Sequence, residues 1–427
     1  MKIKRLIALL LIVMMIVSLT ACGIFNTTGK VYWLNFKPEL AETLQTLAAR
    51  YKEEKGVDVR IETPESGTYH ATLDEEMSSD EPPTMFVING QLSASEWAGS
   101  VLDLNGTGIA GELTTNSYNL TNEGGKLVGI PYCLECFGIA VNPDLIRSLG
   151  YSVEDIKDFE SLKNIAEAIH SNASWLGFDA FSAPDMDASS SWRMTAHLAN
   201  LEYFYEEREA VSSWSECPAS LTGAYMSNYK NLYDLIINNS PTAPSELAAG
   251  GHDPLGQFTS GKTAFCLAGS WDYAQLSKSV SNVQMIPYYC GVKGEEKAAL
   301  NSGSENFWAV NANVPEENQK ATLAFMKWLV TDESASAALV QQLGNMPFQS
   351  CPASGNGFLS TQEQYLKDGR YKMDWLMTYQ PNSDAYRADL VEAMNAYNAS
   401  QTDANWDKVR SAFVNGWIKQ YVAVHND

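Results

Sequence analysis

One carboxylate, Glu135, interrupts an otherwise uncharged stretch over residues 127–141. Pro131 and the apolar residues around it predict an extended strand, in which an unpaired charge is unusual because burying it without partners is costly. Two interpretations fit. Glu135 is either paired with an unseen arginine or backbone donors, or faces solvent on a half-exposed strand; alternatively, it is a hydrogen-bond acceptor exposed where the strand crosses a ligand cleft.

Aromatic side chains are a second source of chemistry. The chain has 11 Trp, 20 Tyr and 15 Phe, and flat apolar rings suit the C–H faces of pyranose rings while amides and carboxylates meet the hydroxyls. Most of these rings are expected in the hydrophobic core. Trp271 stands out because it follows Gly269 and Ser270 just after the apolar run 264–267. The composition favours a carbohydrate ligand.

Motifs of common enzyme classes give no support for catalysis. The sequence has no H-E-x-x-H and no G-x-S-x-G, and we expect no nucleotide-binding loop. The five histidines lack metal-ligand spacing, so neither a metal nor another cofactor is expected. The carboxylate pair of a glycoside hydrolase is defined by separation in space, so that enzyme class stays open.

The N-terminus has the anatomy of an export signal. Lys2, Lys4 and Arg5 precede an apolar run over residues 6–17 that is short for a membrane span, and Leu-Thr-Ala-Cys follows at 19–22. This ending matches a lipobox, so we expect residues 1–21 to be a lipoprotein signal peptide, Cys22 to be lipidated, and 22–30 to be a tether outside the cell membrane. A plain signal peptide with a fortuitous cysteine is the alternative.

Length and charge narrow the class of protein. A chain of 427 residues exceeds what one hydrophobic core usually supports, which predicts two domains. The formal net charge of −22 repels phosphate backbones, so no nucleic-acid partner is expected.

Six cysteines follow Cys22, and two of them, Cys133 and Cys136, form a C-x-x-C. An even number in an exported chain permits disulfides, but domains of this size do not need them. Residues three apart on a strand point to opposite faces, and no second C-x-x-C exists, so we interpret Cys133 and Cys136 as apolar strand residues.

The N-terminal elements predict a βαβ unit. Residues 31–36 form an apolar strand, a helix follows Pro38 and stops at Gly56, and a second strand alternates over 57–61. Ligands bind beyond the carboxyl ends of such parallel strands, which places Asn35, Phe36 and Lys37 near a potential site. Trp33 is expected in the core. A third strand over 84–89 ends in Asn89-Gly90-Gln91, and residues 158–170 predict an amphipathic helix.

Several motifs resemble one known family. Pro131-x-x-x-Glu135 followed by Asn142-Pro143-Asp144-Leu145, and the F-x-x-G-K-x-A pattern at 258–264 followed by Gly269-Ser270-Trp271, are similar to maltose-binding-protein-like extracellular solute-binding proteins, which deliver sugars to ABC importers. The resemblance implies an α/β, two-lobed type II periplasmic-binding-protein fold. Each lobe would be a mixed, mostly parallel sheet flanked by helices. Lobe 1 would comprise 31–132 and 288–345, and lobe 2 would comprise 133–287 and 346–427, with crossing strands at Glu135 and over 282–289.

The same resemblance implies the ligand contacts. Glu135 would accept hydrogen bonds from sugar hydroxyls and Trp271 would stack on a sugar ring, with contributions from the residues after strands one and three. Further candidates are Trp192, Arg193, Glu305 and Asn306. Maltose binders carry an Asp-Lys pair after strand one and an Asp-Arg pair after strand three, where this chain has Lys37-Pro38 and Gln91-Leu92. A ligand other than maltose is therefore implied.

The expected function is a monomeric, lipid-anchored carrier of a carbohydrate, most simply an oligosaccharide, that delivers it to ABC permease subunits. The membrane would be contacted only through the lipid anchor. A surface glycoside hydrolase and a glycan-capture lipoprotein without a transporter are the alternatives.

Overall fold

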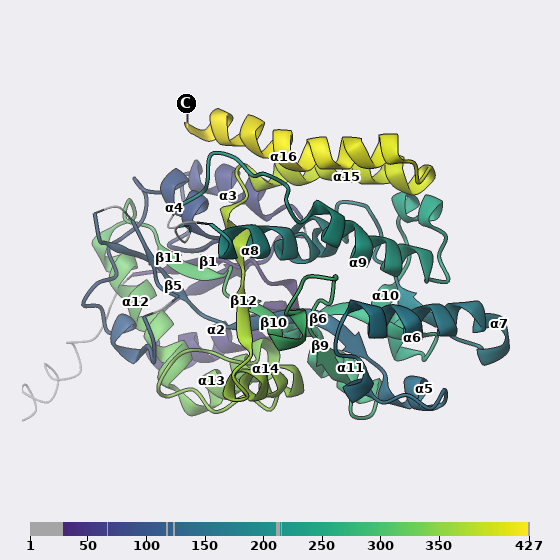
Figure 1. Ribbon diagram of the computed structural model, residues 1–427. Helices are drawn as coiled ribbons and strands as arrows, with labels where there is room; N and C mark the ends of the chain where they lie inside the picture. Colours follow the sequence, from purple (N-terminus) through teal and green to yellow (C-terminus); the bar gives the residue numbers. More distant parts are fainter. Residues whose placement is uncertain are drawn as a thin grey trace, which may run out of the picture.

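A computed structural model describes residues 29–425 except 66, 117, 123, 211–213 and 215, and leaves out the side chains of Gln91 and Leu92 (Figure 1). The predicted signal peptide and Cys22 lie outside the described residues. Two six-stranded sheets, each with its own buried apolar core, organise the described chain. They correspond to the two expected lobes.

The first sheet has the strand order β2-β1-β3-β11-β5-β4. β1 pairs in parallel with β2 and β3, whereas β11 pairs antiparallel with β3 and β5, and β4 pairs antiparallel with β5. The strands are β1 (Val31–Leu34), β2 (Val59–Glu62), β3 (Met85–Ile88), β4 (Leu120–Thr121), β5 (Leu127–Pro131) and β11 (Phe307–Val310).

The predicted βαβ unit is confirmed. α2 (Ala41–Lys55) connects β1 to β2 and buries the apolar face formed by Leu44, Leu47, Ala48 and Tyr51. It ends at Gly56, whose φ of 71° is the left-handed conformation that glycine adopts without strain. The other helices of this lobe are η1 (Pro38–Leu40), α3 (Tyr69–Met77), α4 (Gln91–Glu96), η2 (Ala110–Glu112), α12 (Glu316–Thr331) and α13 (Glu333–Leu343).

The second sheet has the order β12-β10-β6-β8-β7, and β9 also pairs with β6. The outer pairs β12–β10 and β8–β7 are parallel, and β6 is antiparallel to β10, β8 and β9. The strands are β6 (Glu135–Val141), β7 (Asp179–Ser182), β8 (Thr263–Gly269), β9 (Gln284–Ile286), β10 (Ala298–Gly303) and β12 (Tyr371–Asp374). Both sheets are mixed as expected, but the expectation that they are mostly parallel is wrong, because the chain returns to each sheet from the other lobe in the opposite direction.

Helices cover the second sheet, and the predicted amphipathic helix is α6 (Phe159–Ser171), capped by the Asp158 carboxylate. α15 (Ser383–Ala399) and α16 (Asp403–His425), yellow in Figure 1, lie side by side at one edge of the molecule. The remaining helices are α5 (Pro143–Arg147), η3 (Val153–Asp155), α7 (Ala173–Leu176), η4 (Arg193–Leu198), α8 (Asn200–Arg208), α9 (Met226–Asn238), η5 (Pro244–Ala249), α10 (Pro254–Thr259), η6 (Ser270–Asp272), α11 (Tyr273–Ser279), η7 (Glu295–Lys297), α14 (Gly357–Lys367) and η8 (Leu376–Tyr379).

The chain passes between the sheets after β5, after β10 and after α13. β9 and β10 both pair with β6, so the segment before Gly303 belongs to the second lobe. The expected boundary at residue 288 and the expected crossing over 282–289 are therefore wrong. The hydrophobic pattern predicted the strands there, but only the pairing partner decides which sheet a strand joins.

The cysteines in the described part of the chain are free thiols, at Cys133, Cys136, Cys217, Cys266, Cys290 and Cys351. Cys133 packs into the core of the first lobe and Cys136 into a cluster behind the second sheet. Both cysteines are buried, as expected, but only Cys136 lies on a strand, because Cys133 falls between β5 and β6. Among the helices the structure describes, none is both long and apolar enough to cross a membrane.

Candidate functional site

A cleft of about 1000 Å³ opens between the lobes. The first lobe contributes the loop after β1, η1, α3 and α4, and the second lobe contributes η4, the turn η6, η8 and the start of α15. Its aromatic lining residues are Phe36, Tyr69, Trp97, Trp192 and Trp271. Its ionisable lining residues are Lys37, Glu39, Glu65, His70, Asp74, Glu96, His197, Glu305, Asp384, Arg387 and Glu392.

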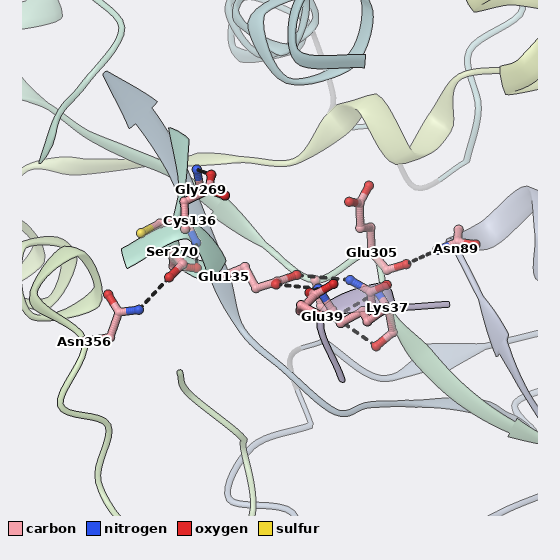
Figure 2. Close-up of polar contacts among 12 residues, drawn as sticks. Lys37, Glu39, Asn89, Glu135, Cys136, Gly269, Ser270, Glu305 and Asn356 are labelled. Carbon is pink, nitrogen blue, oxygen red and sulfur yellow. Dashed lines mark hydrogen bonds and ion pairs between the residues drawn. The ribbon is translucent and has the colours of Figure 1, made fainter. Parts of the chain in front are cut away.

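Trp271 lies on η6, a short turn directly after the central strand β8. Ser270 fixes this turn, because its hydroxyl accepts a hydrogen bond from the Cys136 backbone N–H at 3.2 Å and its carbonyl accepts one from the Asn356 amide at 2.6 Å (Figure 2). The Asp272 carboxylate also accepts from the Gly269 backbone N–H at 2.9 Å. The turn is thereby held by β6 and by the loop before α14, and it presents the indole to the cleft.

An aromatic cluster surrounds the half-buried Trp271 indole. Its ring centroid lies 5.7 Å from Phe137, 6.0 Å from Trp192 and 5.6 Å from His197. Trp375 closes the cluster at 6.5 Å. Such neighbours restrict the ring, so the face it offers to the cleft is preorganised for stacking.

Glu135 is the first residue of β6 and its side chain is fully buried. Its Oε1 lies 2.8 Å from Lys37 Nζ, and its Oε2 accepts a hydrogen bond from the Asn306 amide at 3.0 Å (Figure 2). Lys37 belongs to the first lobe, and Asn306 lies on the crossing between β10 and β11. Glu135 is thus paired, as in the first sequence interpretation, although its partners are a lysine and an asparagine, and it does not line the cleft.

Residues 46–355 match the sequence model of the bacterial extracellular solute-binding proteins. The chain belongs to this family.

Solved structures show the same fold for this solute-binding protein. RafE in complex with raffinose is 17% identical with a TM-score of 0.71, covering 91% of this chain and 99% of that one. Lmo0181 from Listeria monocytogenes, in complex with cycloalternan, is 14% identical with a TM-score of 0.65, covering 92% and 98%. The GacH receptor of Streptomyces glaucescens is 17% identical with a TM-score of 0.64, covering 93% and 99%. No curated protein matches the sequence. The expected two-lobed periplasmic-binding-protein fold is confirmed.

The loop after β1 brings only some of its predicted residues to the cleft of the solute-binding protein. Phe36 lines it, edge-on to Tyr69 at 5.2 Å. Asn35 is fully buried, and its side chain bridges the Lys37 backbone, accepting from N–H at 3.1 Å and donating to C=O at 2.6 Å. Asn35 therefore shapes the loop that carries Lys37. Trp33 is buried in the core, as expected.

Asn89 and Glu305 meet at the floor of the cleft. The Asn89 amide donates to the Glu305 backbone carbonyl at 2.7 Å, and both side chains line the cleft. Burial raises the pKa of Glu305 to about 7. His197 Nε2 lies 3.8 Å from the Glu305 carboxylate, and burial together with Arg387 and Arg193 lowers the pKa of His197 well below its usual value. At neutral pH, His197 is a neutral ring that borders an unusually basic carboxylate.

Trp192 and Arg193 differ in position. Trp192 lines the cleft and its indole N–H donates to the Ser189 carbonyl at 2.9 Å. The Arg193 guanidinium lies 4.2 Å from the Trp192 ring centroid and does not line the cleft. Asn306 is also outside the lining, because it is buried against Glu135. The side chain of Gln91 lies outside the described residues.

The sequence analysis missed much of the cleft, including Tyr69, His70 and Asp74 of α3, Glu96 and Trp97 beside α4, and Asp384 and Arg387 of α15. Their amphipathic helices resemble ordinary surface helices, so no local signal marks them. Carboxylates from both lobes, Asp74, Glu96 and Asp384 among them, line the same cleft. Burial, together with the neighbouring Asp74 and Asp384, raises the pKa of Glu96.

The described residues offer no metal centre, because they contain no group of three or more His, Cys, Asp or Glu that could hold an ion. Residues 256–263 do match the spacing G-x-x-x-x-G-K-[ST]. In the structure, however, this segment runs from helix α10 into strand β8, the reverse of the strand-loop-helix order that a phosphate-binding loop requires.

Proposed function

We propose that this solute-binding protein takes up an uncharged or amino-substituted oligosaccharide in the cleft and delivers it to an ABC import permease, tethered to the membrane through a lipidated Cys22. One observation carries the proposal: a cleft of about 1000 Å³ in which aromatic faces from both lobes alternate with carboxylates and amides. Aromatic faces suit the C–H surfaces of sugar rings, and carboxylates accept hydrogen bonds from hydroxyls.

The size of the cleft supports a ligand of several rings, since pockets for small ligands span roughly 300–1000 Å³. The solved relatives are compatible with this, because their names include raffinose, cycloalternan and chitin oligosaccharide.

The charge of the cleft sets the ligand class. Carboxylates line both lobes, whereas the lining cations other than histidine are Lys37 and Arg387, and Lys37 is neutralised by Glu135. A cleft lined by one sign of charge focuses its field on the ligand. Uronic acids, sialic acids and sugar phosphates are therefore repelled.

The lobes would close on the sugar because the ligand contacts both walls only in the closed state. The closed form would then dock on the permease as a monomer. No step of this cycle changes the sugar chemically, so the protein acts as a carrier.

A thermal-shift screen tests the proposal, since a ligand that binds only the native state raises the melting temperature. The panel pairs neutral and amino oligosaccharides with uronic-acid oligosaccharides of equal length. Stabilisation by neutral or amino members alone is expected. No stabilisation by any sugar, or stabilisation by uronic acids alone, would refute it. Release of shorter sugars from a stabilising ligand would instead support the glycoside hydrolase.

A further inference from the structure

The Lys37 ammonium is buried at the floor of the cleft. Its side chain is 6% exposed, yet it lines the cleft, and its Nζ lies 5.4 Å from the centroid of the Trp271 ring. An ammonium group has three N–H donors. Two have protein acceptors, Glu135 at 2.8 Å and Glu39 at a longer 3.4 Å, and no third acceptor is recorded within the described part of the chain. One donor is left for the cleft.

Glu135 keeps this ammonium charged and in place. Burial alone would lower the pKa of Lys37, but the Glu135 and Glu39 carboxylates hold it well above its usual value. The Glu135 carboxylate is itself fixed by Asn306, and the backbone of Lys37 is fixed by Asn35. The Glu135 partner and the Lys37 backbone are therefore both held in place, whereas the Glu39 carboxylate is partly exposed.

We propose that Glu135 is a positioning residue that acts through Lys37, and that Lys37, beside the Trp271 face, is the group that meets the ligand. The proposal rests on the proposed function and deepens it. Because the ammonium is a donor only, the ring on Trp271 must turn an acceptor oxygen, such as a hydroxyl, ring or acetamido oxygen, toward Lys37. This assignment replaces the direct contact between Glu135 and sugar that the family resemblance implies.

The pair lies beside the crossings between the two lobes. Glu135 begins β6 immediately after the first crossing between lobes, and Asn306 lies on the second crossing. Displacements on domain closure are smallest at the hinge. The pair therefore lies beside both crossings, where movement of the lobes displaces it least.

The first experiment needs no sugar. Lysines of the ligand-free protein are labelled with an amine-reactive acylating reagent, and the rates at Lys37, the exposed Lys278 and the partly buried Lys372 are compared by mass spectrometry. We expect Lys37 to react at least tenfold more slowly than Lys278, and severalfold faster in Glu135→Gln than in the wild type. Lys372 reports any general loosening and should not change.

The matched control is Glu167→Gln, which removes an exposed carboxylate of α6 far from the pair and should leave the rate at Lys37 unaltered. An unchanged Lys37 rate in Glu135→Gln, or a wild-type Lys37 as reactive as Lys278, would overturn the proposal. Because the labelling needs no ligand, it tests whether Glu135 holds Lys37 even if no sugar binds. A failure of the sugar screen would then refute the proposed function alone.

The second experiment is a double-mutant cycle with any sugar that stabilises the wild type in the screen. Lys37→Met and Glu135→Gln are each expected to weaken binding at least tenfold, and the double variant should bind no more weakly than Lys37→Met alone. If the affinity losses of the two single variants multiply in the double variant, Glu135 contacts the sugar independently of Lys37. Lys37→Met leaves the buried Glu135 carboxylate without its cation and can destabilise the fold for that reason. The double variant should then recover stability. A double variant that stays equally unstable would count against the pairing.

Discussion

The Trp271 indole lies directly against the backbone of Gly269: a Cβ at Gly269 would be 2.3 Å from the ring atom Cε2 of Trp271. Gly269 has a φ of −101°, which any residue can adopt, so its backbone conformation does not require glycine. Glycine is required instead because the indole occupies the space where a Cβ would lie. Gly269 thereby allows Trp271 to lie along the end of β8 and face the cleft.

Gly269→Ala is therefore expected to displace the indole. Real Cβ atoms do not approach other atoms this closely, so the ring must move, at a stability cost of about 1–3 kcal/mol for overpacking. Affinity for a stacking sugar should fall at least tenfold, or about 1.4 kcal/mol. Calorimetry of binding and denaturant unfolding measure both effects. Gly99→Ala, where a Cβ would have open space, is the control and should change neither.

Trp271→Ala and Trp33→Ala should give opposite patterns. Trp33 is fully buried, so its truncation should cost about 3–5 kcal/mol of unfolding free energy. Trp271 is half-buried and lines the cleft, so its truncation should cost less stability, yet remove most of the affinity. Tryptophan fluorescence should change on adding the sugar in the wild type and much less in Trp271→Ala. Normal sugar binding by a strongly destabilised Trp271→Ala would show that the indole is only core packing.

Stability should depend on pH through Glu305. Its folded pKa is raised by burial from 4.5 to about 7, so the folded state binds the proton more tightly than the unfolded state. This stabilisation is complete below about pH 4.5 and is lost as pH rises to about 7. The shift from 4.5 to about 7 is about 2.5 pKa units, and at about 1.4 kcal/mol per unit the loss is on the order of 3 kcal/mol.

Glu305→Gln removes this titration. The stability of the variant relative to wild type should increase between pH 5 and pH 7, as followed by denaturant unfolding at each pH. Asp272, whose pKa burial raises to about 6, titrates in both proteins and cancels in the difference. Parallel pH profiles of the two proteins would contradict the assignment.

Cys22→Ala tests the proposed anchor. Without the thiol there is no diacylation, so the variant should appear in the soluble extracytoplasmic fraction or remain uncleaved. Cell fractionation and mass spectrometry of the N-terminal peptide measure this. A processed variant that still sediments with membranes would show that another feature holds the protein there.

The sequence by itself determined the local elements and some of the site. Alternation and helical periodicity predicted the β1-α2-β2 unit and the helix after Asp158, because local propensity and amphipathic patterning act within a few residues. The single extended stretch predicted over 127–141 is two strands, β5 and β6, which join different sheets. The family resemblance carried by Gly269-Ser270-Trp271 implied that Trp271 stacks on a sugar; the structure places Trp271 in the cleft lining, and the stacking stays a prediction. These features depend on neighbours in the chain.

Only the tertiary structure decided what those elements meet. Glu135 pairs with Lys37, 98 residues away, and with Asn306, 171 residues away, so no local pattern could show that its charge is satisfied. The strand over 298–303 joins the second sheet because its partners are β6 and β12, although its own residues would fit either sheet. Carboxylates of α3, α4 and α15 line one cleft because helices from both lobes face it. Only the packing of the whole chain brings these helices together.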